Sequence, residues 1–196
     1  MQTPNHKVVG TSVISEDLPR AKVTLPKSFK YVGADRWNLF DVADCEIQVF
    51  VEADNQKRVK SYCWVQFEAY LPSKPTYSYE YKNGTDIKIA GLDFNMRPRF
   101  GPMETTFKPG SEIERVVRLI SAAGYTMPKE IINVRLVHLP EPTKRRELMI
   151  LYAEDMAPTG VTFAELIVDN KLSPKWAPVE AALVKRVLQR VKIQKL

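Results

Sequence analysis

The chain has 196 residues, of which 44% are hydrophobic and 27% charged, a composition typical of one ordinary globular domain and not of a disordered chain. No apolar run approaches the roughly 20 residues that a membrane-spanning helix needs. The formal net charge is +6, but residues 1–100 contain 14 basic and 12 acidic side chains and residues 101–196 contain 15 and 11. Because the basic residues are spread along the chain, nucleic acid is not the expected partner.

The motifs that would identify a compartment, a metal site or a cofactor site are weak or missing. The first 20 residues lack the basic-then-apolar layout of a signal peptide, so we expect a cytoplasmic protein, although an exported chain without its leader would look the same. The two histidines, His6 and His138, lie far apart, and no histidine pair is near Cys45 or Cys63. The sequence therefore predicts no metal site. Phosphate-loop, dinucleotide and nucleophile-elbow motifs are absent, so we expect no cofactor.

The first third of the chain predicts short strands followed by a long hairpin. Residues 1–20 are expected to form a peripheral N-terminal segment, and strand-like pieces occupy 7–13 and 21–25. Residues 29–53 are rich in β-branched and aromatic side chains, as strands are, and a second strand-like limb covers 58–71. The polar stretch between the two limbs predicts their turn.

A second hairpin is expected after residue 75. Asn83-Gly84 is the strongest short hairpin signal in the chain and predicts a type I′ turn. Its first limb carries Tyr77, Tyr79 and Tyr81 on one side. Residues 97–110 are then expected to form a loop.

The second half of the chain changes to helical periodicity. Ser111 and Glu114 predict a capping box for a helix near 111–123, and two strands follow within 132–153. Thr162 and Glu165 predict a short helix, and Ser173-Pro174 predicts the start of a long C-terminal helix near 174–192. The last twelve residues are basic with no acid and suit a polar helix face or tail.

These elements predict an α+β fold in a single domain covering residues 1–196. The order is many strands, a helix, two strands and then helices, without regular alternation, so we expect a curved antiparallel sheet of about six to eight strands, rich in hairpins. The helix near 111–123 and the long helix near 174–192 are expected to cover it.

The hairpin of residues 45–72 carries the candidate binding residues. If parity alone sorts its faces, odd positions form an ordinary core and even positions carry aromatic and polar side chains together. The predicted ligand-binding residues are Phe50, Tyr62, Trp64, Gln66, Glu68 and Tyr70. Rings interleaved with polar groups are typical of a pocket wall. Alternatively, helices cover these residues and the polar ones lie at the rim.

The register of this hairpin decides what its cysteines do. Pairing Val51 with Val59 buries the most apolar surface and places Cys45 opposite Val65. Cys45 and Cys63 are then diagonal, too far apart for a disulfide, and we expect two buried thiols. A register shifted by two would place them opposite each other and permit a disulfide. A reactive cysteine is the third alternative.

A few other residues are candidates for chemistry. His138 would be a general base if it shared a cavity with Glu68 or Glu46; otherwise it is a hydrogen-bonded core or rim residue. Arg97 and Arg99 would receive an anionic ligand, or else are solvated loop residues.

The sequence leaves three functions open. The first is a non-enzymatic protein that binds a small apolar or aromatic ligand between sheet and helices. The second is a structural or protein-interaction module that uses the edge from Tyr77 to Tyr81 or the basic C-terminal helix. The third is an enzyme in which Glu68 or His138 is the acid–base group.

Overall fold

The centre of the structure is a seven-stranded sheet in which every pair of neighbours is antiparallel. The computed structural model describes residues 2–196. The strand order in this sheet is β4-β5-β6-β10-β9-β8-β7. Its strands are β4 (Lys30–Leu39), β5 (Ala43–Ala53), β6 (Val59–Tyr70), β7 (Thr85–Ile89), β8 (Leu92–Pro102), β9 (Glu130–His138) and β10 (Arg146–Asp155).

A smaller sheet joins the two ends of the described chain. It has the order β1-β2-β3-β13, and these strands are β1 (Lys7–Val9), β2 (Ser12–Ser15), β3 (Ala21–Thr24) and β13 (Lys192–Lys195). Two short strands, β11 (Ile167–Val168) and β12 (Lys171–Leu172), form a separate hairpin. The helices are α1 (Glu112–Ala122), η1 (Ala157–Thr159), α2 (Phe163–Leu166) and α3 (Trp176–Arg190).

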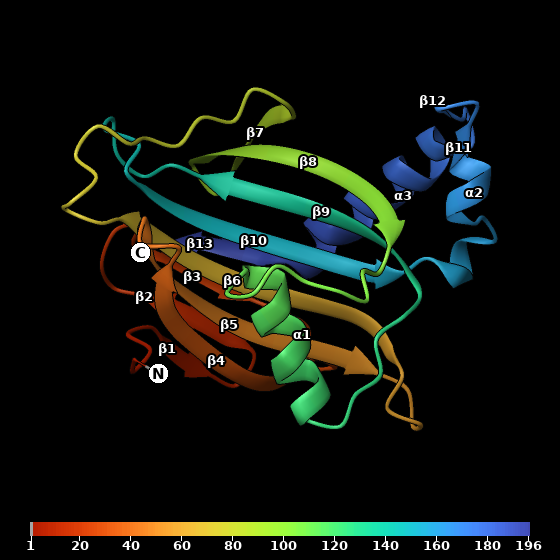
Figure 1. Cartoon of the computed structure of the whole chain (residues 1–196), viewed down its shortest axis with the longest axis horizontal. Coiled ribbons are helices and arrows are strands. Elements are labelled where there is room, and N and C mark those ends of the chain that lie inside the picture. The colour runs from red at the N-terminus through yellow and green to blue at the C-terminus, as the bar shows by residue number, and fades with distance from the viewer. Residues whose placement is uncertain (1) are drawn as a thin grey trace.

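The large sheet is covered differently on its two faces (Figure 1). On one face, α1 contributes Val116 and Ile120 to a core that includes Val49 and Trp64. On the other face, α3 and the small sheet share a core with Cys63, Val65 and other residues of the large sheet. These are called below the α1 face and the α3 face. The predicted α+β class, with antiparallel sheets and helices near 111–123 and 174–192, is confirmed.

The predicted register of the long hairpin is wrong, because Val59 pairs with Ala53 and not with Val51, and because β6 contains a bulge. Ala53 pairs with Val59, but Glu52 pairs with Ser61, so Lys60 has no partner on β5. The extra residue reverses the parity of everything after it on β6. Odd residues of β5 therefore share a face with even residues of β6.

The bulge also separates the two cysteines. Cys45 pairs with Glu68 on the α1 face, and Cys63 pairs with Phe50 on the α3 face. Both are buried free thiols, as expected. They are kept apart by the sheet, and not by the diagonal arrangement that the predicted register would give. Burial raises the pKa of both thiols, so neither has the lowered pKa of a nucleophilic cysteine.

The second hairpin turns at a different place from the predicted one. Strands β7 and β8 are joined through Ala90 and Gly91, both with positive φ. At the predicted turn, Gly84 instead lets the backbone pass close to β8, since a Cβ there would lie 2.6 Å from the Asn95 side chain. The tyrosine segment before it is not a strand. Arg97 and Arg99, expected in a loop, lie in β8.

The helix signals at Ser111 and Thr162 are confirmed, but Ser173-Pro174 does not start the last helix, since α3 begins at Trp176 with Lys175 at its N-cap. The Ser111 hydroxyl accepts a hydrogen bond from the Glu114 amide at the start of α1, and the Glu165 carboxylate accepts one from the Thr162 amide at 2.9 Å. The C-terminal helix ends at Arg190, earlier than expected, and the basic residues after it form β13, paired with β3.

A buried carboxylate fixes α1 to the sheet. Asp35 on β4 is 3% exposed, and it accepts hydrogen bonds from Arg115 Nη1 and Arg118 Nη2 of α1, both at 2.6 Å. The Arg115 guanidinium also lies 4.5 Å from the centre of the Trp37 ring. The pair of arginines therefore holds one turn of α1 against β4.

We predict that Asp35→Ala lowers the free energy of unfolding by about 3 kcal/mol, because it leaves two arginines without their buried partner. Urea unfolding measures this. The exposed Asp17→Ala is the control and should change stability by less than about 0.5 kcal/mol. Equal effects of the two substitutions would contradict the role of Asp35.

Candidate functional site

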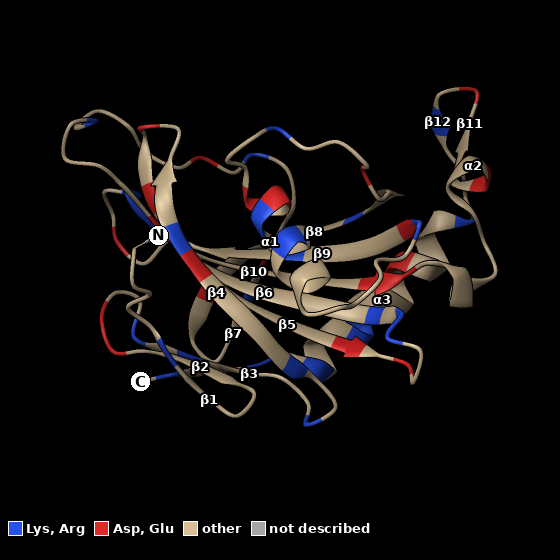
Figure 2. Ribbon diagram, turned by 60° about the horizontal axis from the view of Figure 1, so that its bottom comes forward, with Lys and Arg blue, Asp and Glu red and all other residues tan. Residues whose placement is uncertain are grey.

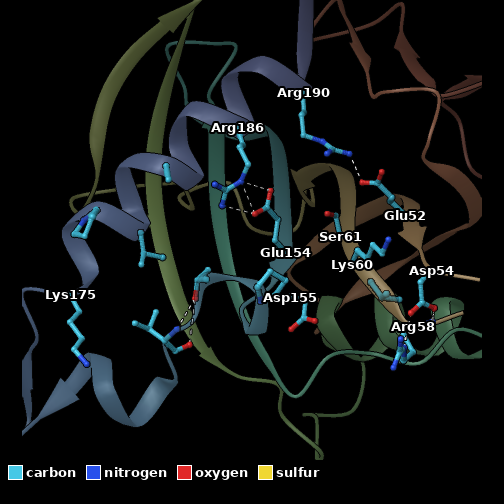
Figure 3. Close-up of a pocket in the computed structure, with 17 residues that line it drawn as sticks. Glu52, Asp54, Arg58, Lys60, Ser61, Glu154, Asp155, Lys175, Arg186 and Arg190 are labelled. Carbon is cyan, nitrogen blue, oxygen red and sulfur yellow. Dashed lines mark hydrogen bonds and ion pairs between the residues drawn. The ribbon is translucent and has the colours of Figure 1, made fainter. Parts of the chain in front are cut away.

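A groove runs between α3 and the ends of three strands of the large sheet (Figure 3). Its volume is about 1020 Å³, which is enough for a small organic ligand. The sheet side is formed where β5 ends, β6 begins and β10 ends, and the other side is formed by α3 and the turn after β10.

Ion pairs connect the two sides of the groove. The Arg186 guanidinium of α3 donates to both carboxylate oxygens of Glu154 on β10, at 2.8–3.1 Å. One turn further along α3, Arg190 pairs with Glu52 on β5. Figure 2 shows basic positions of α3 beside acidic positions at the neighbouring strand ends. The ion pairs hold α3 in place over this end of the sheet.

The remaining wall is apolar on the helix side and carries a cation on the sheet side. Val161, Val179 and Ala182 line it together with two prolines, Pro158 and Pro178. Lys60, the bulged residue of β6, also lines the groove and forms no ion pair with any residue from 2 to 196. An apolar wall with one uncommitted cation suits an amphipathic molecule with an anionic group.

The structure divides the binding residues predicted from the sequence. Tyr62, Trp64, Gln66, Glu68 and Tyr70 follow one another along the α1 face of β6, whereas Phe50 lies on the α3 face. None of them lines the groove under α3.

On the α1 face these residues form a buried hydrogen-bonded chain. Trp64 Nε1 donates to Gln66 Oε1 at 3.1 Å, and Gln66 Nε2 donates to Glu68 Oε2 at 2.8 Å. The Tyr79 hydroxyl donates to the other oxygen of Glu68 at 2.7 Å. The tyrosine segment after β6 thus covers this end of the sheet, with Tyr79 stacked on Tyr70 at 4.2 Å between ring centres.

A second buried carboxylate, which the sequence analysis missed, lies beside Glu68. Glu147 on β10 pairs directly with Glu68 across the strands and is 3% exposed. It accepts a hydrogen bond from the Tyr81 hydroxyl. Burial raises the pKa of Glu147 to about 8, and the neighbouring Glu68 adds to the rise. Burial also raises the pKa of Glu68.

The histidine candidate lies apart from both predicted carboxylate partners. His138 belongs to one row of paired residues on the α3 face. In this row His138 pairs with Leu148, Leu148 pairs with Phe67, and Phe67 pairs with Glu46. Two strands therefore separate His138 from Glu46, and the sheet separates it from Glu68. The His138 Nδ1 atom lies 2.8 Å from the Asp93 carbonyl oxygen.

Glu46 holds the N-terminal segment. Burial alone would raise its pKa, but hydrogen bonds from His6 and from the Asn5 amide lower it to about 2. The His6 ring stacks on Phe67 with 3.5 Å between ring centres. This carboxylate therefore serves as an anchor for residues 5 and 6.

The groove residues were visible in the sequence only as separate signals. Arg186 and Arg190 are four apart and so share a helix face, and Glu154 ends a strand. Their proximity depends on where α3 lies, which a local pattern does not contain.

Comparison with known proteins assigns neither a family nor a function to the chain. No protein-family model matches the chain, and no curated protein or solved structure matches it significantly. Among residues 2–196 no group of three or more histidine, cysteine or acidic side chains is placed to hold a metal ion. No helix in the described chain is long and apolar enough to cross a membrane.

We predict that Glu147→Gln removes part of the pH dependence of stability. The folded pKa of about 8 exceeds the ordinary value of 4.5, so the contribution of this group is complete below about pH 4.5 and is lost as the pH rises to about 8. At about pH 9 the variant should be more stable than the original protein by about 1–3 kcal/mol, because glutamine carries no charge to bury.

Chemical unfolding at a series of pH values measures this difference. The exposed Glu80→Gln makes the same charge change and is the control. If the original protein and Glu147→Gln lose stability in parallel between about pH 6 and 9, Glu147 does not carry a proton in the folded state.

Proposed function

We propose that the protein is a non-enzymatic binding protein, and that the groove under α3 takes a small amphipathic ligand with an apolar body and an anionic group. The observation that carries this proposal is the groove itself, about 1020 Å³ in volume and formed by groups that are already held in place. A pre-formed groove binds without a large cost of ordering.

The chemistry of the wall supports binding over catalysis. Arg186 and Arg190 are each engaged with a carboxylate across the groove, and Asp155 accepts a hydrogen bond from the Ala157 amide at 3.0 Å. These contacts hold the charged groups in fixed positions in the walls. The apolar body of the ligand would lie along Val179 and Ala182, with its anionic group at Lys60.

The same ion pairs argue against the alternative in which a partner protein docks on α3. A partner that docked on the basic residues of α3 would have to compete with Glu52 and Glu154, which already hold Arg190 and Arg186. Ligand binding in the groove leaves these pairs intact.

We predict that Ala182→Trp blocks the groove. The dye anilinonaphthalene sulfonate, which combines apolar rings with an anionic group, serves as the probe, and its fluorescence measures binding. The large ring should occupy the space beside Val179 and weaken dye binding by about tenfold or more, a loss of about 1.4 kcal/mol.

Ala181→Trp is the matched control, since Ala181 is exposed on the same helix and does not line the groove. It should bind the dye as the original protein does. Equal binding by both variants, or no saturable binding by the original protein, would overturn the proposal. A native mass spectrum that shows a retained small molecule, lost on denaturation and lost in Ala182→Trp, would identify the natural ligand.

A further inference from the structure

Three arginines lie together on the α1 face of strands β8 and β9. Arg97 pairs directly with Arg135 across the two strands, and Arg99 is the next residue of β8 on the same face. Directly paired residues have Cα atoms about 5 Å apart, and alternate residues of a strand are about 7 Å apart. Like charges in this arrangement repel each other and destabilise the sheet.

Arg97, Arg99 and Arg135 form no ion pair within the described part of the chain. Of the nine other arginines, six form ion pairs: Arg36, Arg58, Arg115, Arg118, Arg186 and Arg190. Burial, together with Arg97 and Arg135, lowers the pKa of Arg99.

Arg135 is held in position without being neutralised. Its guanidinium lies 4.7 Å from the centre of the Tyr81 ring, and its Nε atom is buried without a hydrogen-bond partner. The carboxyl group that influences it, Glu147, is hydrogen-bonded to the Tyr81 hydroxyl. Burial raises the pKa of Glu147, which favours its neutral form and weakens its compensation of the arginine charge.

The neighbouring row of the sheet contains further polar groups. Asn133 pairs with Arg99 and is 9% exposed. In the same row, Ala153 lies between Asn133 and Tyr62, whose hydroxyl is buried without a hydrogen-bond partner. In Figure 1, α1 lies over β4, β5 and β6 and leaves the corresponding face of β8 and β9 without a helix. Arg99 is exposed and Arg97 and Arg135 are partly exposed, so solvent reaches the cluster.

We propose that Arg97, Arg99 and Arg135 form a binding site for a small oxyanion, a phosphate or carboxylate group, on the α1 face of β8 and β9. Guanidinium groups bind such groups through paired N–H donors. The bound charge would relieve the repulsion between Arg97 and Arg135. This site lies on the opposite face of the sheet from the groove under α3 and does not depend on the ligand of that groove.

The size of the cluster favours a small anion over a nucleic acid. Toward the centre of the sheet, the row of Arg97 and Arg135 continues with Leu151 on β10, and the row of Arg99 and Asn133 continues with Ala153, both apolar. A polynucleotide requires a longer track of basic residues, one for each phosphate that it neutralises. Three arginines within about 7 Å suit a single phosphate or carboxylate group.

Titration calorimetry of the whole chain with inorganic phosphate, and separately with succinate, tests the proposal at constant ionic strength. We expect saturable binding of at least one of the two anions, and the comparison shows whether the natural group is a phosphate or a carboxylate. Arg97→Gln and Arg135→Gln should each weaken binding by about tenfold or more, since each removes charge-assisted hydrogen bonds. Arg20→Gln, at an exposed arginine without an ion pair, should change it by less than about twofold.

Thermal unfolding is the second measurement, and it distinguishes a loss of anion binding from misfolding of the variant. In low salt without anion, Arg97→Gln should unfold at a higher temperature than the original protein, because it removes one of two opposed like charges. The absence of saturable binding of both anions would overturn the proposal. So would equal weakening by Arg20→Gln, which would show that only the overall charge matters.

Discussion

The bulge at Lys60 is the constraint on which the rest of the structure depends. A β-strand has a side-chain period of two, so one extra residue moves all later side chains of that strand to the opposite face. After the bulge, Tyr62 and Trp64 face α1, while Ser61 and Cys63 face α3. The same insertion leaves Lys60 without a strand partner, and its side chain lines the groove under α3.

Charged residues are paired differently on the two faces of the large sheet. On the α3 face, Glu52 and Glu154 are matched by Arg190 and Arg186, so the groove has fixed walls and an uncommitted Lys60. On the α1 face, Asp35 is matched by α1, whereas Glu68 and Glu147 pair with each other and the three arginines form no ion pair within residues 2–196. Adjacent ionisable groups of the same sign destabilise a fold when both are charged, and such arrangements are enriched at functional sites. This asymmetry is the reason for assigning an amphipathic ligand to one face and an oxyanion to the other.

Local patterns were enough to predict the fold class, the two main helices and the long strands, because periodicity and capping residues such as Ser111 and Glu114 act within one element. They were not enough for the register, since the bulge at Lys60 depends on how β6 packs against β5. Nor could they place β7, where Ala90-Gly91 supplies the turn and Asn83-Gly84 does not. The groove depends on residues such as Glu52 and Arg190, 138 positions apart in the chain, and no local signal joins them. Trp64 was expected on the wall of a pocket, and the structure places it in the core shared with α1, where its Nε1 atom donates to Gln66.

The register of β5 against β6 can be measured directly, and both proposed sites depend on the assignment of the faces that it fixes. Nuclear Overhauser contacts between backbone protons across the two strands would show which residues are paired. The structure predicts contacts that join Val51 to Tyr62 and Val49 to Trp64, with the Trp64 ring close to the methyl groups of Val116. Contacts that join Val51 to Ser61 would mean that the strands pair without the bulge. Tyr62 and Trp64 would then lie under α3, and the division of the sheet into two binding faces would be wrong.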